Sequence, residues 1–185
     1  MRVRKAGLIG FLLLTSLAAV VGYAPRGATQ EVATAAALRI DRLVIRKGDR
    51  RLEVFEGERL VRTYQVAIGG GGEGAKVYAG DRRTPEGEYR VDRRHVSRSF
   101  HRFLHISYPN AADLRRYRQA RATGAVPAAA GIGSAIGIHG STRGLSLLAP
   151  NARWSWTDGC IAVSNPEIEE LFESVVANAE LEILP

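Results

Sequence analysis

Short runs of β-forming residues follow one another closely in the middle of the sequence. Three such runs, Leu43–Ile45, Leu52–Phe55 and Leu60–Ile68, are separated by turns that contain Gly48 and Gly57. Runs of this length, joined by short glycine-containing turns, are typical of antiparallel hairpins. The pattern therefore predicts a β-meander at the start of the domain.

Further strands are predicted downstream. Thr84-Pro85-Glu86-Gly87 has the residues of a tight turn, with proline at its second position and glycine at its fourth, and is expected to join two strands. The runs Glu88–Val91 and Phe103–Tyr108 are predicted strands, and Ile136–Ile138 is a short apolar strand. Residues 69–74 hold five glycines but lack the Gly-Lys-Ser/Thr ending of a phosphate-binding loop. We expect a flexible hairpin or an active-site flap there.

Two helices are predicted in the second half of the chain. Asn110 caps a short helix over residues 111–121, whose arginines are expected to form a solvated face. Asn165, Pro166 and Glu167 supply a cap, a first-turn proline and a first-turn acid for a helix that extends to about Asn178. A last strand covers residues 181–184. Residues 38–185 are thus predicted to form one β-rich α+β domain with a mid-chain and a C-terminal helix.

The N-terminus has the composition of an export signal. Arg2, Arg4 and Lys5 precede an uncharged apolar run from Ala6 to Ala24, which is the layout of a secretory signal. The run is also long enough for an uncleaved anchor, since a spanning helix needs about 20 apolar residues. We expect residues 1–24 to be a signal peptide or N-terminal anchor, residues 25–37 to be a linker, and the protein to reach the periplasm or cell envelope.

The charge of the exported chain limits its partners. Without residues 1–24 it has 23 Lys and Arg against 19 Asp and Glu, a net charge of +4. A mildly basic surface suits an anionic cell-wall polymer, but solubility alone accounts for it equally well. No basic stripe with interleaved aromatic residues is present, so nucleic acid is not an expected partner. Contact with a membrane is expected only through residues 1–24, if they are retained.

Cys160 is the only cysteine in the chain. An internal disulfide is therefore impossible, and a lipid attached at the N-terminus is excluded because no cysteine follows the apolar run. A structural zinc site would need further paired ligands, and a thiol redox protein usually has a Cys-x-x-Cys pair. The remaining interpretations are a small buried hydrophobic residue and a nucleophile. Neither requires a metal or an organic cofactor.

The surroundings of Cys160 favour the nucleophile. Gly159 precedes the thiol, and glycine allows a sharp turn that brings backbone N–H groups close to a substrate. A catalytic cysteine also needs a base nearby. His139 is the candidate base because it ends an apolar strand and is followed by the flexible Gly140-Ser141. A structural histidine is the alternative.

These segments resemble a known family. Ile138-His139-Gly140-Ser141 and Thr157-Asp158-Gly159-Cys160-Ile161 are similar to the signature of the L,D-transpeptidase catalytic domain, also called the YkuD domain. The likeness extends over residues 40–185 and includes the Thr84–Tyr89 turn and strand. The phrases 104–110 and 156–163 resemble the murein L,D-transpeptidase branch, which includes amidases that cleave the outer-membrane lipoprotein from peptidoglycan.

The resemblance implies roles for individual residues. Cys160 would be the nucleophile, His139 its base, and the Gly140 backbone carbonyl the group that fixes the imidazole. The backbone N–H groups of Gly159 and Cys160 would receive the oxyanion. The sequence departs from the family at Asp158, where a histidine is frequent, and at Ala162, where most members have an arginine that recognises a substrate carboxylate. The other candidates for substrate binding are Thr157, Ser141, Arg143 and Arg153, and either of the two arginines could replace the missing one.

The implied reaction is acyl transfer on peptidoglycan stem peptides. Cys160 would attack the carbonyl between diaminopimelate and a terminal D-alanine to form a thioester, which an amine or water then resolves. An amine acceptor makes the enzyme a transpeptidase. Water makes it a carboxypeptidase or an amidase, which could release a peptidoglycan-linked lipoprotein. The non-enzymatic alternative is a catalytically silent wall-binding module.

Overall fold

The structure is a computed structural model that describes residues 38–140 and 155–185. The expected signal or anchor, the linker, and three of the candidate substrate-binding residues lie outside the described residues: Ser141, Arg143 and Arg153. Neither helix of the described segments is long and apolar enough to cross a membrane.

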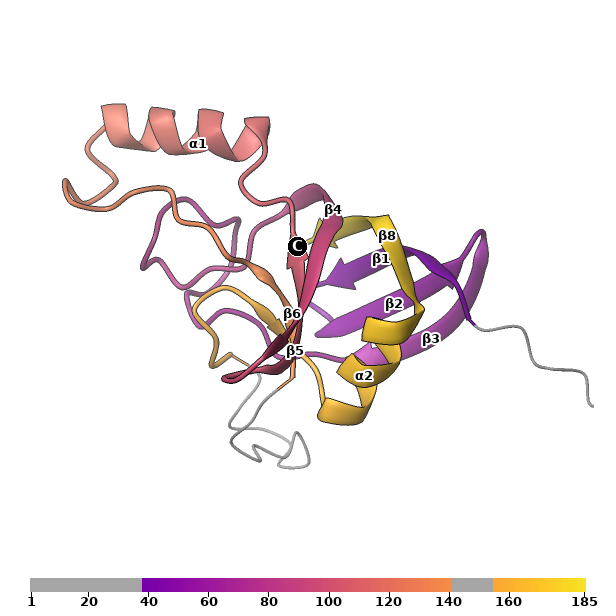
Figure 1. Cartoon of the computed structure of the whole chain (residues 1–185). Coiled ribbons are helices and arrows are strands. Elements are labelled where there is room, and N and C mark those ends of the chain that lie inside the picture. Colours follow the sequence, from indigo (N-terminus) through magenta and orange to yellow (C-terminus); the bar gives the residue numbers. More distant parts are fainter. Residues whose placement is uncertain (1–37, 141–154) are drawn as a thin grey trace, which may run out of the picture. The chain divides into compact units, whose positions relative to one another are not determined.

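The described strands form a sheet of eight in the order β3-β2-β1-β8-β4-β5-β6-β7 (Figure 1). The expected α+β fold, rich in β-structure and with two helices, is confirmed. The strands are β1 (Ile40–Arg46), β2 (Arg51–Glu56), β3 (Arg59–Gln65), β4 (Gly87–Ser97), β5 (His101–Ile106), β6 (Gly137–His139), β7 (Ile161–Ala162) and β8 (Val175–Leu184).

The first three strands form the predicted antiparallel meander. β8 then lies between β1 and β4, parallel to the first and antiparallel to the second. The last strand in the sequence therefore lies in the middle of the sheet. Three residues at alternate positions of β8 are at most 2% exposed and contribute to the hydrophobic core: Ala179, Leu181 and Ile183.

The two edges of the sheet meet where the segment after β3 pairs with β7. The Ala67 N–H, just beyond β3, donates to the Ala162 oxygen of β7 at 2.9 Å, and the Ala162 N–H donates to the Ala67 oxygen at 2.8 Å. The strand that is first in spatial order is thus followed by a segment that pairs with the last. This closure holds the segment around Cys160 between two stretches of backbone.

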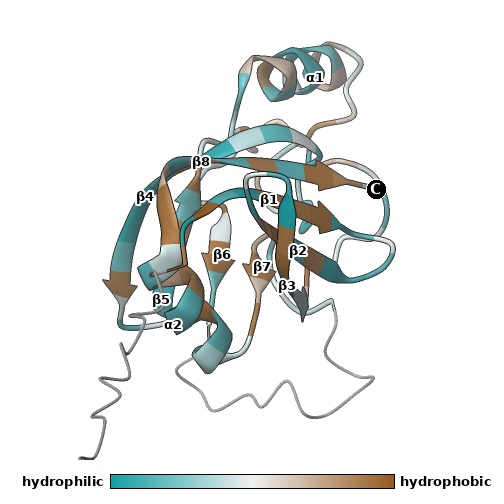
Figure 2. Cartoon of the chain, turned by 90° about the vertical axis from the view of Figure 1, so that its right-hand side faces the viewer, coloured by the Kyte–Doolittle hydropathy of each residue, from teal (hydrophilic) through white to brown (hydrophobic). Residues whose placement is uncertain are grey.

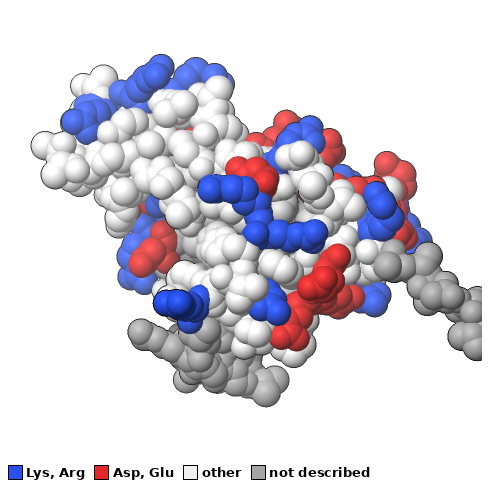
Figure 3. Space-filling model, viewed as in Figure 1, with Lys and Arg blue, Asp and Glu red and all other residues white. Residues whose placement is uncertain are grey.

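The mid-chain helix is confirmed as α1 (Ala111–Ala122), with the predicted cap at Asn110. The side-chain oxygen of Asn110 accepts from the N–H groups of Ala112 and Asp113, and the Asp113 carboxylate accepts from the Asn110 N–H. This reciprocal capping satisfies N–H groups that a helix start otherwise leaves without partners. Arg115 is exposed and Arg116 is half-buried against Asp113. Figure 3 shows blue side chains gathered on this helix at the upper left.

The C-terminal helix is shorter than predicted. α2 (Asn165–Ser174) is capped by Ser164 rather than Asn165, and it ends four residues before Asn178. Val175, which lies within the predicted helix, instead begins β8 and pairs with Ile40. Two adjacent β-branched residues at this point suit a strand, and pairing with two neighbouring strands overrides the helical pattern.

α2 contacts strands from both halves of the sheet order, β3 and β5. The Glu170 carboxylate accepts from Arg62 and from the Tyr64 hydroxyl on β3, while Glu169 lies 2.5 Å from His101 on β5. Ile168 and Leu171, fully buried, face the core. Figure 2 shows α2 beside β5, with hydrophobic stretches along the strands above it.

The segment between β3 and β4 differs from the prediction. Thr84–Gly87 leads into β4 but does not join two strands, since residues 66–86 form only isolated bridges. The glycine-rich stretch is fixed at its start rather than free: the Gly70 N–H donates to the Thr157 oxygen and the Gly71 N–H to the Arg82 oxygen. Glycine is needed at position 69, where a Cβ would lie 2.1 Å from the Arg82 carbonyl oxygen. This stretch therefore lines the loop that precedes Cys160.

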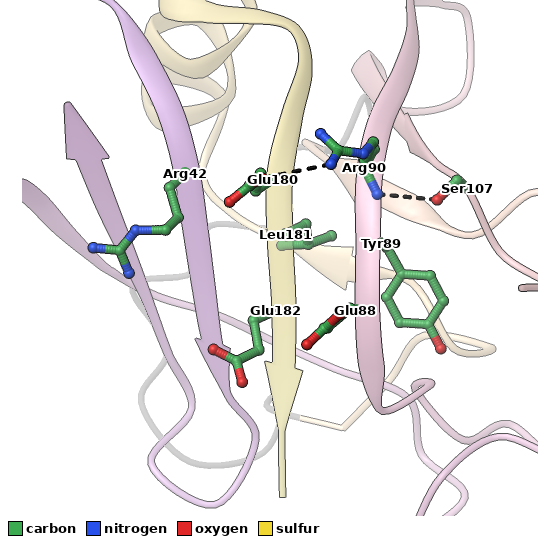
Figure 4. Close-up of a pocket in the computed structure, with 8 residues that line it drawn as sticks. All are labelled: Arg42, Glu88, Tyr89, Arg90, Ser107, Glu180, Leu181 and Glu182. Carbon is green, nitrogen blue, oxygen red and sulfur yellow. Dashed lines mark hydrogen bonds and ion pairs between the residues drawn. The ribbon is translucent and has the colours of Figure 1, made fainter. Parts of the chain in front are cut away.

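The face formed by β1, β8 and β4 carries charges of both signs around a hollow of about 450 Å³ (Figure 4). Arg90 pairs with Glu180, which lies directly opposite it in the register. Glu88 and Glu182 also lie directly opposite one another. The mixed charges of this face give it no strong preference for an anion or a cation.

Candidate active site

Strands β6 and β7 bring His139 and Cys160 to the same face of the sheet. These strands are parallel, with Ile138 opposite Ile161 and His139 opposite Ala162. Continued by one residue, this register puts Cys160, which directly precedes β7, opposite Gly137. Because side chains alternate along a strand, Cys160 and His139 project from the same face. A strand spacing of about 4.8 Å and a rise of about 3.3 Å per residue put their Cα atoms about 8 Å apart.

His139 is held in one orientation. Its Nδ1 donates to the Gly140 carbonyl oxygen at 2.7 Å, which leaves Nε2 as the ring nitrogen able to accept a proton. The ring is stacked on Phe103, with centroids 5.8 Å apart, and lies 4.3 Å from the Phe100 ring. The Trp156 ring meets it edge-on. His139 is 1% exposed, and burial lowers its pKa, against an opposing contribution from the Gly140 bond. The imidazole is therefore neutral in the ordinary pH range and available as a base.

The loop before Cys160 is closed by its own threonine. The Thr157 hydroxyl donates to the Cys160 carbonyl oxygen at 2.6 Å and accepts from the Gly159 N–H at 3.2 Å. Gly159 has a φ of +128°, and a Cβ there would lie 2.7 Å from the Arg83 carbonyl oxygen, so only glycine fits. Thr157 and the Gly159 N–H, both expected at the substrate, are therefore engaged within the loop.

The Cys160 thiol is partly buried, and its Sγ lies 3.6 Å from the Ala135 carbonyl oxygen. Burial raises the pKa of the Cys160 thiol to about 11; a hydrogen bond with the Gly137 backbone and the charge of Lys76 act in the opposite direction. Lys76 is itself buried and pairs with Asp81 at 2.8 Å. At neutral pH the resting thiol is thus protonated, and a nucleophilic role for it would require a base that removes its proton.

Several neighbours of the pair carry no local sequence signal. The aromatic rings that pack on His139 come from a segment distant in sequence, at Phe100 and Phe103. The same holds for Lys76, whose charge acts to lower the pKa of Cys160. The register between β5 and β6, which places Phe103 opposite His139, could have identified the first contact. Ala162 is 1% exposed and lies in the sheet opposite His139. Among the described residues, no group of three or more His, Cys, Asp or Glu could hold a metal ion.

Gly137 is packed closely against Phe103 and Leu104. We therefore predict that Gly137→Ala is destabilising. The new Cβ would lie 2.3 Å from Cε1 of Phe103 and 2.4 Å from the Leu104 carbonyl oxygen. Overpacking of this kind lowers the free energy of unfolding by about 1–3 kcal/mol, and displacement of Phe103 disturbs the ring on which His139 stacks. Denaturant titration measures the loss. Gly131→Ala is the matched control, since a Cβ there meets nothing within 4 Å; equal stability of the two variants would contradict the prediction.

Comparison with protein families gives one match. The model of the YkuD family, the L,D-transpeptidase catalytic domain, matches residues 40–183. This span includes every described strand and both helices apart from the last residue of β8. The resemblance drawn from the histidine and cysteine motifs is thereby confirmed. A search of curated proteins finds no match.

Solved structures share the fold. Bd1075 of Bdellovibrio bacteriovorus is 24% identical with a TM-score of 0.53, over 82% of this chain and 50% of its own. The helical cell shape determining protein Pgp2 of Campylobacter jejuni is 22% identical with a TM-score of 0.51, over 78% of this chain and 48% of its own. An L,D-transpeptidase of Mycobacterium smegmatis is 9% identical with a TM-score of 0.50, over 79% of this chain and 59% of its own. The chain thus matches about half the length of these proteins.

Proposed function

The chain belongs to the L,D-transpeptidase catalytic domain family, and on this premise we propose that it is a cysteine acyltransferase that acts on peptidoglycan stem peptides. The observation that carries the proposal is the placement of His139 and Cys160 on one sheet face from adjacent parallel strands, with the imidazole held by the Gly140 carbonyl. A silent binding module would have no need of an oriented neutral base beside a thiol.

In the first half-reaction, Cys160 attacks the carbonyl carbon between diaminopimelate and the terminal D-alanine. His139 Nε2 takes the thiol proton as the sulfur–carbon bond forms. The carbonyl oxygen becomes an oxyanion, for which we propose the Cys160 N–H as donor, because the Gly159 N–H already donates to Thr157. The carbon–nitrogen bond then breaks, and the imidazolium returns its proton to the departing D-alanine amine. A thioester on Cys160 remains.

In the second half-reaction, an amine or water attacks the thioester. His139 accepts the proton of the incoming nucleophile and delivers it to the sulfur as the thioester breaks. An amine from another stem peptide gives a cross-link, a lysine amine gives a lipoprotein attached to the wall, and water gives a trimmed peptide. We propose transfer to an amine, with hydrolysis as the alternative of the same site.

Incubation of the protein with peptidoglycan fragments, followed by mass spectrometry of protein and products, tests the proposal. Transfer predicts a protein adduct at Cys160 and a product in which two stem peptides are joined. Release of D-alanine without a joined product indicates the hydrolase. Binding with no adduct and no product indicates the silent module and overturns the acyltransferase.

We also propose that Arg143 or Arg153 supplies the positive charge that Ala162 lacks. The stem peptide ends in a carboxylate next to the scissile bond, and burying it without a partner costs several kcal/mol. Alanine at the true partner should raise KM strongly while Cys160 stays reactive towards a thiol reagent. A double variant that processes fragments with the KM of the unaltered protein would remove both arginines from consideration.

We propose finally that residues 1–24 deliver the protein to the cell envelope, in keeping with a substrate that lies outside the cytoplasm. Cell fractionation of the full chain and of a version without these residues tests this. An equal cytoplasmic distribution of the two would contradict export.

A further inference from the structure

A groove of about 820 Å³ lies beside the catalytic pair, on the same side of the sheet. Its walls come from β4, from β5 and from the segment that enters β6. Among the residues that line it are Arg93, Phe103, His105 and Ala135. All the residues that line it belong to the described part of the chain. The groove takes no part in the mechanism given above.

Two residues of the groove wall contact the candidate catalytic pair. The Ala135 carbonyl, in its wall, lies 3.6 Å from the Cys160 sulfur. Phe103, also in its wall, is the ring on which His139 stacks. A peptide whose carbonyl is held at Cys160 therefore has this groove as a path along which the rest of the molecule can extend.

The register of the sheet sets how far Arg93 lies from the thiol. Arg93 on β4 is opposite His105 on β5, and His105 is opposite Gly137 on β6. Continued by one residue, the register of β6 with β7 puts Cys160, which directly precedes β7, next to Gly137. Three strand spacings of about 4.8 Å put the Cα atoms of Arg93 and Cys160 about 14 Å apart. An extended peptide advances about 3.3 Å per residue. With the reach of the arginine side chain, the guanidinium can meet a group two to four residues from the scissile carbonyl.

The charges of the groove favour an anion. Its lining includes two arginines and two histidines and no Asp or Glu. Arg94 is turned away, since it donates to the carbonyl oxygens of Phe172 and Val175 at the end of α2. Arg93 is therefore the cation that the groove presents.

Arg93 is also oriented. His105 donates through Nδ1 to Asp92 at 2.6 Å, so its Nε2 accepts from Arg93 Nη2 at 3.2 Å. Asp92 itself approaches Arg93 only at 3.9 Å. The arginine side chain is 71% exposed and keeps most of its five N–H donors for a ligand. A planar guanidinium held at one edge suits two-point binding of a carboxylate.

We propose that Arg93 binds a carboxylate of the stem peptide two to four residues from the bond that Cys160 attacks, with His105 as the positioning residue that holds the guanidinium. The assignment rests on the acyltransferase function proposed above. It concerns a different carboxylate from the terminal one assigned to Arg143 or Arg153, since Arg93 lies three strands away from the thiol.

The test measures binding without turnover, in the full chain carrying Cys160→Ala. Calorimetry compares a synthetic stem tetrapeptide with peptides in which each carboxylate in turn is a carboxamide. Adding Arg93→Ala should weaken binding of the unmodified peptide about tenfold, the usual size for loss of a charged hydrogen-bonded contact. One carboxamide peptide should show the same loss on the protein that keeps Arg93, and no further loss when Arg93 is removed. Arg115→Ala, an exposed arginine on α1, is the matched control.

Two results would overturn the assignment: a change of less than twofold on removal of Arg93, or an equal loss for every carboxamide peptide. With Cys160 intact, Arg93→Ala should raise KM and leave kcat and the rate of thiol alkylation unchanged. The outcome for the reaction itself is separate. Arginine-dependent binding without any adduct on the unaltered protein would keep the binding site and remove the acyltransferase. Adduct formation whose dependence on peptide concentration is the same with and without Arg93 would do the reverse.

Discussion

Replacing Cys160 with alanine is expected to reduce turnover of peptidoglycan fragments by at least about 10³-fold and to remove the protein adduct altogether. In the proposed mechanism the sulfur is the atom that forms the bond to the substrate, and alanine leaves no group to replace it. Cys160→Ser should also be inactive, because an alcohol in the same place ionises far less readily than a thiol. After incubation with fragments, mass spectrometry of the intact protein measures the adduct and mass spectrometry of the products measures turnover.

The fold of these variants is expected to remain. Cys160 is only partly buried, and the loop around it is held by the Thr157 hydroxyl and by backbone contacts that do not involve sulfur. Denaturant titration is the control that separates lost chemistry from lost structure. An alanine variant that forms products at the rate of the unaltered protein would exclude the thioester mechanism.

Much of the fold follows from local sequence signals. The meander of β1 to β3 follows from β-forming runs and glycine turns, and the start of α1 from Asn110 and Asp113. These features depend on residues close together in the chain, which is why sequence alone predicts them.

The features that were missed depend on contacts between distant segments. The helical pattern after Asn165 continues into Val175, and only pairing with Ile40 reveals that a strand begins there. The glycines at 69–71 suggest a free flap, but backbone bonds to Thr157 and Arg82 hold them in place. Neither partner can be identified from the local sequence.

The candidate site likewise has residues that the local sequence predicts and residues that it does not. The glycines beside His139 and Cys160 and the family signature identify the two residues, because the motif is local. The aromatic rings around His139 and the row from Arg93 to Cys160 depend on the register of four strands. A register is set by the packing of the whole sheet, so these groups have no signature of their own.

The second large effect is expected at the base: His139→Gln should lower kcat by about 10²–10⁴-fold, the usual contribution of general acid–base catalysis. Glutamine keeps a polar side chain of similar size, but it accepts no proton near neutral pH. With the pKa of the Cys160 thiol raised to about 11 by burial, only about one molecule in 10⁴ would carry a thiolate at pH 7. Without a base, that small fraction limits the attack.

The pH dependence distinguishes this role from a structural one. Burial lowers the pKa of His139, so the neutral imidazole persists below the ordinary histidine value of about 6.5. Activity of the unaltered protein should therefore be retained at pH 6.5 and be lost only as pH falls through that lowered pKa. In His139→Gln, alkylation of Cys160 should instead rise about tenfold per pH unit until the pH approaches 11, because the thiolate must form without help. His101→Gln, a histidine paired with Glu169 outside the site, is the control and should keep the profile of the unaltered protein. If His139→Gln alkylates at the same rate and with the same pH profile as that control, His139 is not the base that removes the Cys160 proton.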